Sequence, residues 1–304
     1  MIELHERTRR ICASRIEEIL RRHDCNSVVD PCMGVPTHLN YLKRHGFAVH
    51  GGDLVEWFVR AGEGLVVNDF TILRENEVAE IVEMLPGRIY SVDLFKAWEG
   101  VFFSEEQCVY LGVWHDNVHN LRSDGQTGLA IVGLWNVLCY WLQKAQYPDE
   151  MQDVPPSELA WNYIRKTENW VATNLRRNTV RQADVLTTIN AHQADALFIA
   201  PPARNSFRSA DARIWMWEAW WHGNPYYNIE HAYRDSLFGQ RGSDEAGYAR
   251  AIASVLSSAQ EYPLVILQTT EHHMHEFEPH LRNARPHVEV YAPHPNEVYL
   301  IGTK

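Results

Sequence analysis

The sequence predicts an α/β protein: a three-layer sandwich with a mixed sheet, a terminal β-hairpin and a mainly helical insertion. Short apolar stretches alternate with helix-forming stretches towards both ends of the 304-residue chain, as expected for a parallel sheet covered by helices. Between about residues 95 and 190 the alternation stops and helices are expected. We therefore expect one sheet domain, formed by 1–94 and 191–304, with 95–190 inserted into it.

The first 94 residues predict strands that are each followed by a helix. Isoleucines and leucines fall on one side of 4–22 and arginines on the other, which is typical of an amphipathic helix. Gly46 has the place of a helix C-cap. The elements expected after the first helix are strand 27–30, helix 36–45, strand 47–50, helix 54–61, strand 65–67 and helix 75–85.

The middle of the chain predicts helices, and the sheet then resumes. Ser104 and Gln107 are spaced as a capping box, so a helix is expected to begin there. The last two strands are joined by Pro293-His-Pro-Asn, which indicates a hairpin. The remaining elements expected are helices at about 127–145 and 158–170, strand 195–199, a Trp-rich stretch 215–221, helix 245–260, strand 263–267, helix 275–283, and strands 287–291 and 297–301.

Composition argues against several classes of protein. No run of about 18 apolar residues is present and the first residues lack a signal-peptide pattern, so neither a membrane span nor secretion is expected. The five cysteines form no C-x-x-C pair, which argues against a disulfide framework or a zinc knuckle and favours a cytoplasmic location. A net charge of -11 disfavours nucleic-acid binding, although a local basic face is compatible with it.

Three acidic residues follow the first three predicted strands. The segment Asp30-Pro31-Cys32-Met33-Gly34 lies between a strand and a helix, where a glycine lets a ligand approach the backbone closely. Asp53 follows the second strand and is placed to accept hydrogen bonds from both hydroxyls of a ribose. Asp69 follows the third and could reach an adenine amino group. The alternative is that these aspartates only cap turns and helices.

Together these residues resemble the adenine-specific DNA methyltransferases of the DNA adenine methylase class. The family's D-P-F-x-G-type motif stands here as Asp30-Pro-Cys-Met-Gly34, and the segments 37–46 and 102–107 are similar to family segments. The resemblance implies a methyltransferase-type, Rossmann-like sandwich, with S-adenosylmethionine bound by Asp30, Pro31, Gly34, Asp53 and Asp69. It also implies that the insertion recognises a DNA target.

The chain departs from this family at the end of the fourth predicted strand. There the family carries D-P-P-Y, whose Asp and a Pro carbonyl accept hydrogen bonds from the adenine amino group, and whose Tyr stacks on the flipped base. This chain has Ala200-Pro201-Pro202-Ala203. The loss of both side chains predicts weak adenine methylation. Losing the acceptor costs about 2–4 kcal/mol of transition-state stabilisation, and losing the stacking ring costs about 1–3 kcal/mol more.

Three functions remain open at this point. The chain is an adenine methyltransferase with an altered catalytic motif, a methyltransferase-like protein that only binds S-adenosylmethionine or DNA, or a methyltransferase for another substrate. If it contacts DNA, basic residues of the insertion and of the loop after the fourth strand are expected to contact phosphates. These residues are Arg176, Arg177, Arg181, Arg204 and Arg208.

Two histidine groups raise the question of a metal site. His115 and His119 are four residues apart on a predicted helix, so they could face one ion. The run Glu271-His-His-Met-His275 is denser, but neither group lies in an H-E-x-x-H context. No metal site is therefore predicted. The absence of G-x-S-x-G and P-loop motifs likewise argues against hydrolase and P-loop functions.

Overall fold

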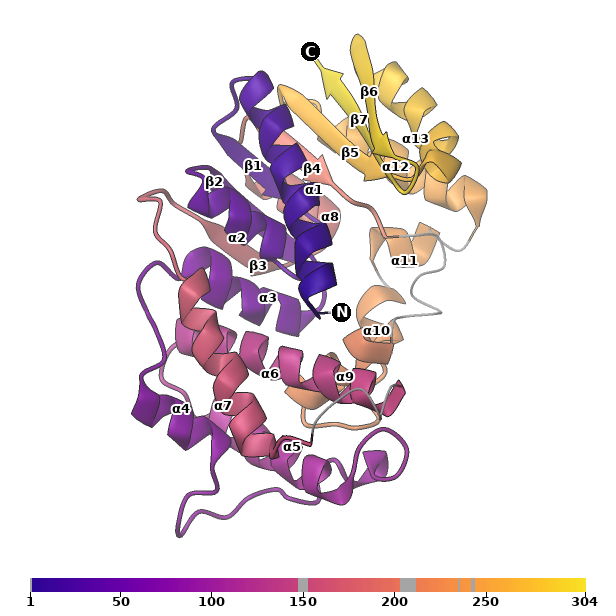
Figure 1. The fold of residues 1–304 in the computed structure, drawn as a ribbon. Helices are drawn as coiled ribbons and strands as arrows, with labels where there is room; N and C mark the ends of the chain where they lie inside the picture. The colour runs from indigo at the N-terminus through magenta and orange to yellow at the C-terminus, as the bar shows by residue number, and fades with distance from the viewer. Residues whose placement is uncertain (1, 147–152, 203–211, 235, 242–243) are drawn as a thin grey trace. The chain divides into compact units, whose positions relative to one another are not determined.

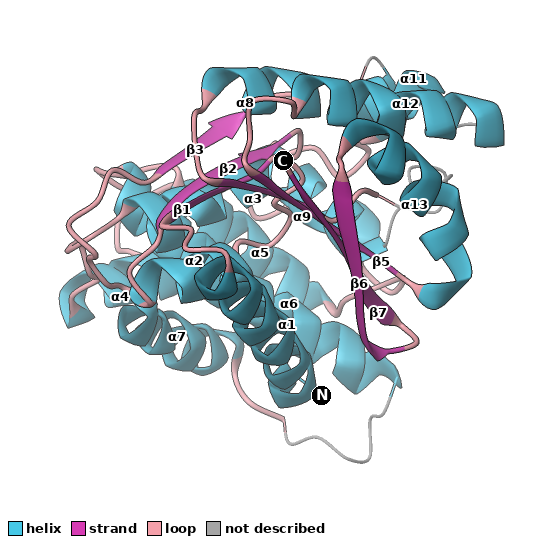
Figure 2. Cartoon of the chain, turned by 90° about the horizontal axis from the view of Figure 1, so that it is seen from above, coloured by secondary structure: helices cyan, strands magenta, loops and turns pink. Residues whose placement is uncertain are grey.

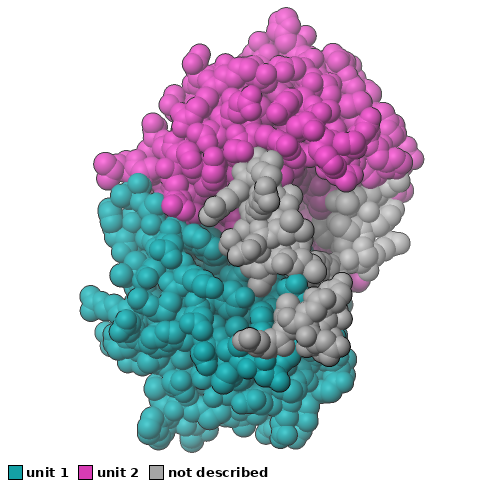
Figure 3. Space-filling view, viewed as in Figure 1, with its two compact units in different colours: residues 1–8, 60–173, 211–229 teal, residues 9–59, 174–210, 230–304 magenta. Residues whose placement is uncertain are grey.

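The computed structural model describes residues 2–146, 153–202, 212–234, 236–241 and 244–304. Its chain divides into two compact units, which Figure 3 shows in different colours. The sheet unit comprises residues 9–59, 174–210 and 230–304, and the helical unit comprises 1–8, 60–173 and 211–229.

Seven strands form one mixed sheet in the order β3-β2-β1-β4-β5-β7-β6 (Figures 1 and 2). Neighbouring strands are parallel, except that β7 runs antiparallel to both β5 and β6. The α/β class, the mixed sheet and the terminal hairpin are thus confirmed. The strands are β1 (Ser27–Asp30), β2 (Ala48–Asp53), β3 (Thr179–Gln182), β4 (Ala196–Ile199), β5 (Leu264–Thr269), β6 (His287–His294) and β7 (Glu297–Thr303).

Helices cover both faces of this sheet (Figure 2). One face carries Val29, Leu197 and Val265, which are buried in an apolar core under α8, α12 and α13. Helices α1 and α2 lie on the opposite face. The helices of the sheet unit are α1 (Ile2–Arg22, from residue 9), α2 (Thr37–Arg44), α3 (Glu56–Gly62, up to residue 59), α8 (Val185–Ala191), α10 (Glu230–Arg234), α11 (Leu237–Arg241), α12 (Glu245–Ser258) and α13 (Glu271–Ala284).

The prediction of a third strand at 65–67 is wrong. These residues lie in a π-helical turn, Glu63–Val67. The segment is apolar because Leu65 and Val66 of this turn are buried in the helical unit. Gly64 lets this turn lie directly on the backbone of Gly128, since a Cβ at Gly64 would come within 2.6 Å of it. A short apolar run has the same composition in a buried helix as in a buried strand, so periodicity does not separate them.

The third strand is β3, which lies in the segment that the sequence assigned to the helical insertion. Its four residues, Thr-Val-Arg-Gln, are half-buried or exposed, because β3 is the edge of the sheet and pairs only with β2. Because β3 is polar, no apolar pattern in the sequence identifies it as a strand. The predicted boundaries of the insertion therefore shift: residues 174–190 belong to the sheet unit, and 60–94 belong to the helical unit.

The helical unit is held together largely by tryptophan. Six of the ten tryptophans of this unit are buried, among them Trp217, Trp220 and Trp221 of the Trp-rich stretch, so those three pack in a core. Ser104 and Gln107 form the predicted capping box at the start of α5. No helix in the described part of the chain is long and apolar enough to cross a membrane. The helices are α4 (Glu75–Val82), α5 (Glu105–Val118), α6 (Asp124–Gln146), α7 (Pro156–Thr167) and α9 (Ala212–Trp221).

Candidate functional site

The predicted cofactor residues of the first strand form a tightly bonded loop between β1 and α2. Asp30 is completely buried, and its Oδ1 accepts a hydrogen bond from the backbone N–H of Cys32 at 2.9 Å. Its Oδ2 lies 2.5 Å from Nε2 of His38, near the start of α2. Pro31 is buried beside it. The carboxylate of Asp30 is therefore directed into its own loop, where it fixes the loop's shape.

Gly34 and Asp53 come together across the ends of β1 and β2. Gly34 has a φ of +53°, and a Cβ added to it would meet no atom within 4 Å, so the space over its backbone is open. Its N–H donates to Oδ2 of Asp53 at 2.8 Å, and the N–H of Val55 donates to Oδ1 at 2.9 Å. A carboxylate has about four lone-pair positions, so Asp53 keeps acceptor capacity for a ligand.

The pKa of the Asp53 carboxyl is raised to about 6. Burial is the main cause, because removing a carboxylate from water disfavours its charged form. The negative charge of Asp30 adds to the effect, whereas the hydrogen bonds from Val55 and Gly34 oppose it. Asp53 thus titrates close to neutrality, as groups in functional sites often do.

Two glycines of β2 allow the loop on one side and α8 on the other to lie close to the strand. The N–H of Met33 donates to the carbonyl oxygen of Gly52 at 3.0 Å. A Cβ on Gly51 would overlap Met33, and a Cβ on Gly52 would overlap Thr188 of α8. Bare backbone at Gly51 is therefore required for the close approach of the loop, whereas bare backbone at Gly52 lets α8 pack on the strand. Gly51, two residues before Asp53, is the sequence signal for the approach of the loop, and its role becomes visible only with the fold.

The predicted role of Asp69 loses its structural basis. Asp69 follows the π-helical turn of the helical unit and does not end a strand of the sheet. The residue that follows the true third strand is Asp184, two positions after β3. Its carboxylate caps α8 by accepting from the N–H of Leu186 at 3.1 Å, and it also accepts from the N–H of Leu237 at 2.9 Å. Asp184 is thus bonded through both oxygens.

The segment Ala200-Pro201-Pro202 directly follows β4, at the carboxyl end of that strand. Ala200 and the two prolines are half-buried, and Ala203 lies outside the described residues. The carbonyl oxygen of Pro202 accepts a hydrogen bond from the hydroxyl of Tyr248, on α12, at 2.8 Å. Of the two proline carbonyls, that of Pro201 is therefore the better candidate for an adenine amino group. Asp195, at the start of β4, accepts from Asn26 and Ser27 and does not replace the missing carboxylate.

The basic residues predicted to contact DNA divide into two groups. Arg176, Arg177 and Arg181 belong to the sheet unit, at and just before its edge strand, whereas the sequence placed them in the helical insertion. Burial is the main cause that lowers the pKa of His50 and of His192, and the charges of Arg177 and Arg181 lower both further, whereas Arg176 is exposed. Arg204 and Arg208 lie outside the described residues.

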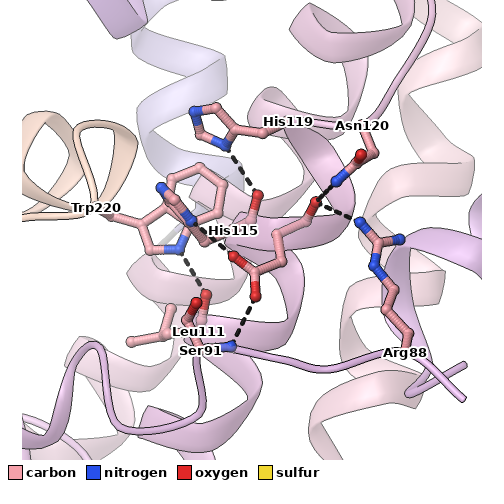
Figure 4. A network of polar contacts seen from close by, with 8 residues as sticks. Arg88, Ser91, Leu111, His115, His119, Asn120 and Trp220 are labelled. Atoms are coloured by element: carbon pink, nitrogen blue, oxygen red, sulfur yellow. Dashed lines mark hydrogen bonds and ion pairs between the residues drawn. The ribbon is translucent and has the colours of Figure 1, made fainter.

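His115 and His119 belong to a network of polar contacts in the helical unit (Figure 4). Nδ1 of His115 lies 3.4 Å from the carboxylate of Asp116, and Nδ1–H of His119 donates to the carbonyl oxygen of His115 at 2.8 Å. The ring of His119 stacks on Trp221, with centroids 4.4 Å apart. Burial is the first cause that lowers the pKa of His115. These contacts give both rings a packing role.

The second histidine group lies on α13. Nδ1 of His273 lies 3.1 Å from the carboxylate of Glu276, one turn along the same helix. The rings of His272 and His273 are in contact edge to face, with centroids 4.8 Å apart. Within the described ranges, no three His, Cys, Asp or Glu side chains converge as the ligands of a metal ion.

No protein-family model matches the sequence, and no curated protein matches it significantly. The chemistry of the loop is therefore the basis for assigning a ligand. A half-buried carboxylate with spare lone pairs beside open space over a glycine fits the ribose of a nucleoside, whose two hydroxyls donate hydrogen bonds. Asp53 and Gly34 are the residues that would hold it.

Proposed function

We propose that this protein is an S-adenosylmethionine-dependent methyltransferase related to the DNA adenine methylase class, with an altered adenine site. The observation that carries the proposal is the bonded pair of Gly34 and Asp53 at the carboxyl ends of neighbouring parallel strands, the edge at which open α/β sheets bind ligands. The sheet supports it, since β7 lies antiparallel between β5 and β6. We take this antiparallel strand as support for the methyltransferase-type fold that the resemblance implies.

In this proposal each residue of the loop has a separate task. Asp53 accepts the ribose hydroxyls, and Gly34 gives the ligand access to the backbone. Asp30 and His38 do not touch the cofactor and instead keep the loop in position. When bound, S-adenosylmethionine supplies an electrophilic methyl group, and the chain's contribution is to hold an acceptor in front of it.

A second candidate function is binding without catalysis. Ala200 offers no acceptor for an adenine amino group, and the carbonyl of Pro202 is already bonded to Tyr248. A chain with these features would bind S-adenosylmethionine or DNA for recognition or regulation. The two candidates share the cofactor loop and differ only in methyl transfer.

Cofactor binding is tested by calorimetry with S-adenosylmethionine. We expect Asp53→Ala to weaken binding at least tenfold, or about 1.4 kcal/mol, because charge-assisted hydrogen bonds from the ribose are lost. Glu261→Gln is the matched control, since Glu261 is an exposed carboxylate before β5, at the opposite end of the parallel strands. Equal affinities of the parent and Asp53→Ala, or no binding by the parent, would contradict the proposal.

The raised pKa of Asp53 predicts a pH dependence of that binding. Ribose hydroxyls bond more strongly to the ionised carboxylate, so affinity should rise as the pH passes the pKa of about 6 from below. We expect binding to be roughly tenfold weaker at pH 5 than at pH 7, because about one tenth of Asp53 is ionised at the lower pH. Calorimetry across this range measures the slope. In Asp53→Asn the slope should be flat, and an unchanged slope would assign the titration to another group.

A further inference from the structure

A compact group of cationic and imidazole side chains lies on the edge strand of the sheet. We call His50, Arg177, Arg181 and His192 the edge cluster. The register pairs His50 of β2 with Thr179 of β3, and Gly52 with Arg181. Because partners in register share a face, His50, Thr179 and Arg181 lie on one face of the sheet. This is the face of α8, and His192 directly follows that helix.

The edge cluster is packed closely. The rings of His50 and His192 stack with centroids 4.5 Å apart and an interplanar angle of 16°. Nδ1 of His50 lies 2.9 Å from the hydroxyl oxygen of Thr179. These contacts fix the two imidazoles beside the arginines of the edge strand.

Two nitrogens of the edge cluster are buried without a hydrogen-bond partner. They are Nε of Arg181 and Nε2 of His192. The N–H at Nε of Arg181 is always a donor, since the guanidinium does not deprotonate in proteins. Leaving such a donor buried and unpaired costs about 1–3 kcal/mol, and the cost is higher when the group is charged. The orphan N–H of Arg181 indicates a partner that accepts a hydrogen bond, and Nε2 of His192 donates to the same partner when its ring carries the proton there.

The charge of the edge cluster indicates what kind of partner fits. Burial, then His192, Arg177 and Arg181, lower the pKa of His50 to about 4, and burial followed by the two arginines lowers the pKa of His192. No carboxylate contributes to either shift, and neither arginine forms an ion pair with any residue in the described part of the chain. Water would satisfy the orphan nitrogens but would leave the positive charge uncompensated, whereas an oxyanion does both.

We propose that the edge cluster is a binding site for a phosphate-type oxyanion. Arg181 and Arg177 are its charged ligands, because a guanidinium matches the geometry of phosphate oxygens. The two imidazoles and the hydroxyl of Thr179 complete its surroundings. The oxyanion belongs to a free phosphate ester or to the backbone of a nucleic acid. The site does not include the loop of Gly34 and Asp53, so its test is independent of S-adenosylmethionine.

The test follows the imidazole signals of His50 and His192 by NMR during titration with inorganic phosphate at constant ionic strength. We expect saturable shifts at millimolar phosphate in the parent, and a rise of about one unit or more in the pKa of His50, since a nearby anion favours the imidazolium. Arg181→Gln should abolish both effects. Arg44→Gln is the matched control, because Arg44 is exposed on α2, which covers the opposite face of the sheet, and it does not act on either imidazole.

Arg177→Gln provides a second variant, because Arg177 is exposed and its replacement leaves the strand unchanged. It should weaken phosphate binding at least about fivefold. If adenosine monophosphate competes with phosphate and a short DNA duplex does not, the oxyanion is that of a free ester. If the duplex competes, the oxyanion is a phosphate of a nucleic-acid backbone. Either result supports the site. The proposal would be overturned if the shifts did not saturate, or if Arg181→Gln and Arg177→Gln showed the same shifts as the parent. Either result would mean that only water fills the edge cluster.

Discussion

The double variant Ala200→Asp, Ala203→Tyr is expected to methylate adenine in DNA roughly a thousandfold faster than the parent chain. Methyl transfer needs the adenine amino nitrogen to direct its lone pair at the methyl group, and an acceptor on that nitrogen holds it there. Ala200 stands at the carboxyl end of β4 without such an acceptor. The aspartate restores it, and the tyrosine restores a ring that holds the plane of the base.

Transfer of a labelled methyl group from S-adenosylmethionine to mixed-sequence DNA measures this gain. Ala284→Asp is the matched control, since it adds the same carboxylate at an exposed position at the end of α13. A parent protein that already methylates adenine at a rate usual for the family would show that the motif is misplaced. If both forms bind cofactor and neither transfers methyl groups, the defect extends beyond these two positions and the binding function is favoured.

Strands buried on both faces were predictable from the sequence, whereas the edge of the sheet was not. The residues of β4 and the first four of β5 are all buried, so each reads as an unbroken apolar run. The edge strand β3 is polar because it is half-exposed, and no pattern distinguishes it from a loop. The misplaced boundary at 190 follows from that property of an edge strand, whereas the wrong strand at 65–67 follows from an apolar run that is buried in a helical turn.

Within the candidate site, residues at strand ends were predictable and their partners were not. Asp30 and Asp53 end β1 and β2, and Gly34 lies four residues after β1, so their position depended only on two strands whose presence was predicted correctly. His38 reaches Asp30 from a separate helix, and Tyr248 reaches Pro202 from 46 residues away. Such contacts depend on tertiary packing, which no spacing in the sequence encodes.

The contact between Asp30 and His38 leads to the second large effect, a loss of stability in Asp30→Ala. We expect the sheet unit to be destabilised by about 3 kcal/mol, because the change removes the acceptor of a buried hydrogen bond and leaves His38 and the Cys32 N–H without it. Asp53→Ala should cost about 1 kcal/mol or less, since its carboxylate is half-buried at a strand end. Hydrogen exchange of peptides from β1 and β2, in increasing urea, measures both changes.

Asp30→Asn separates shape from charge at this position. An amide oxygen still accepts from the N–H of Cys32, and the amide group can pair with a neutral imidazole. We expect it to keep most of the stability that alanine loses, and to bind S-adenosylmethionine within about threefold of the parent, since Asp30 holds the loop without touching the ligand. If Asp30→Asn is as stable as the parent but loses binding as completely as Asp53→Ala, the carboxylate of Asp30 must itself contact the cofactor. The loop would then have to open when the cofactor binds, because that carboxylate is fully buried in the structure.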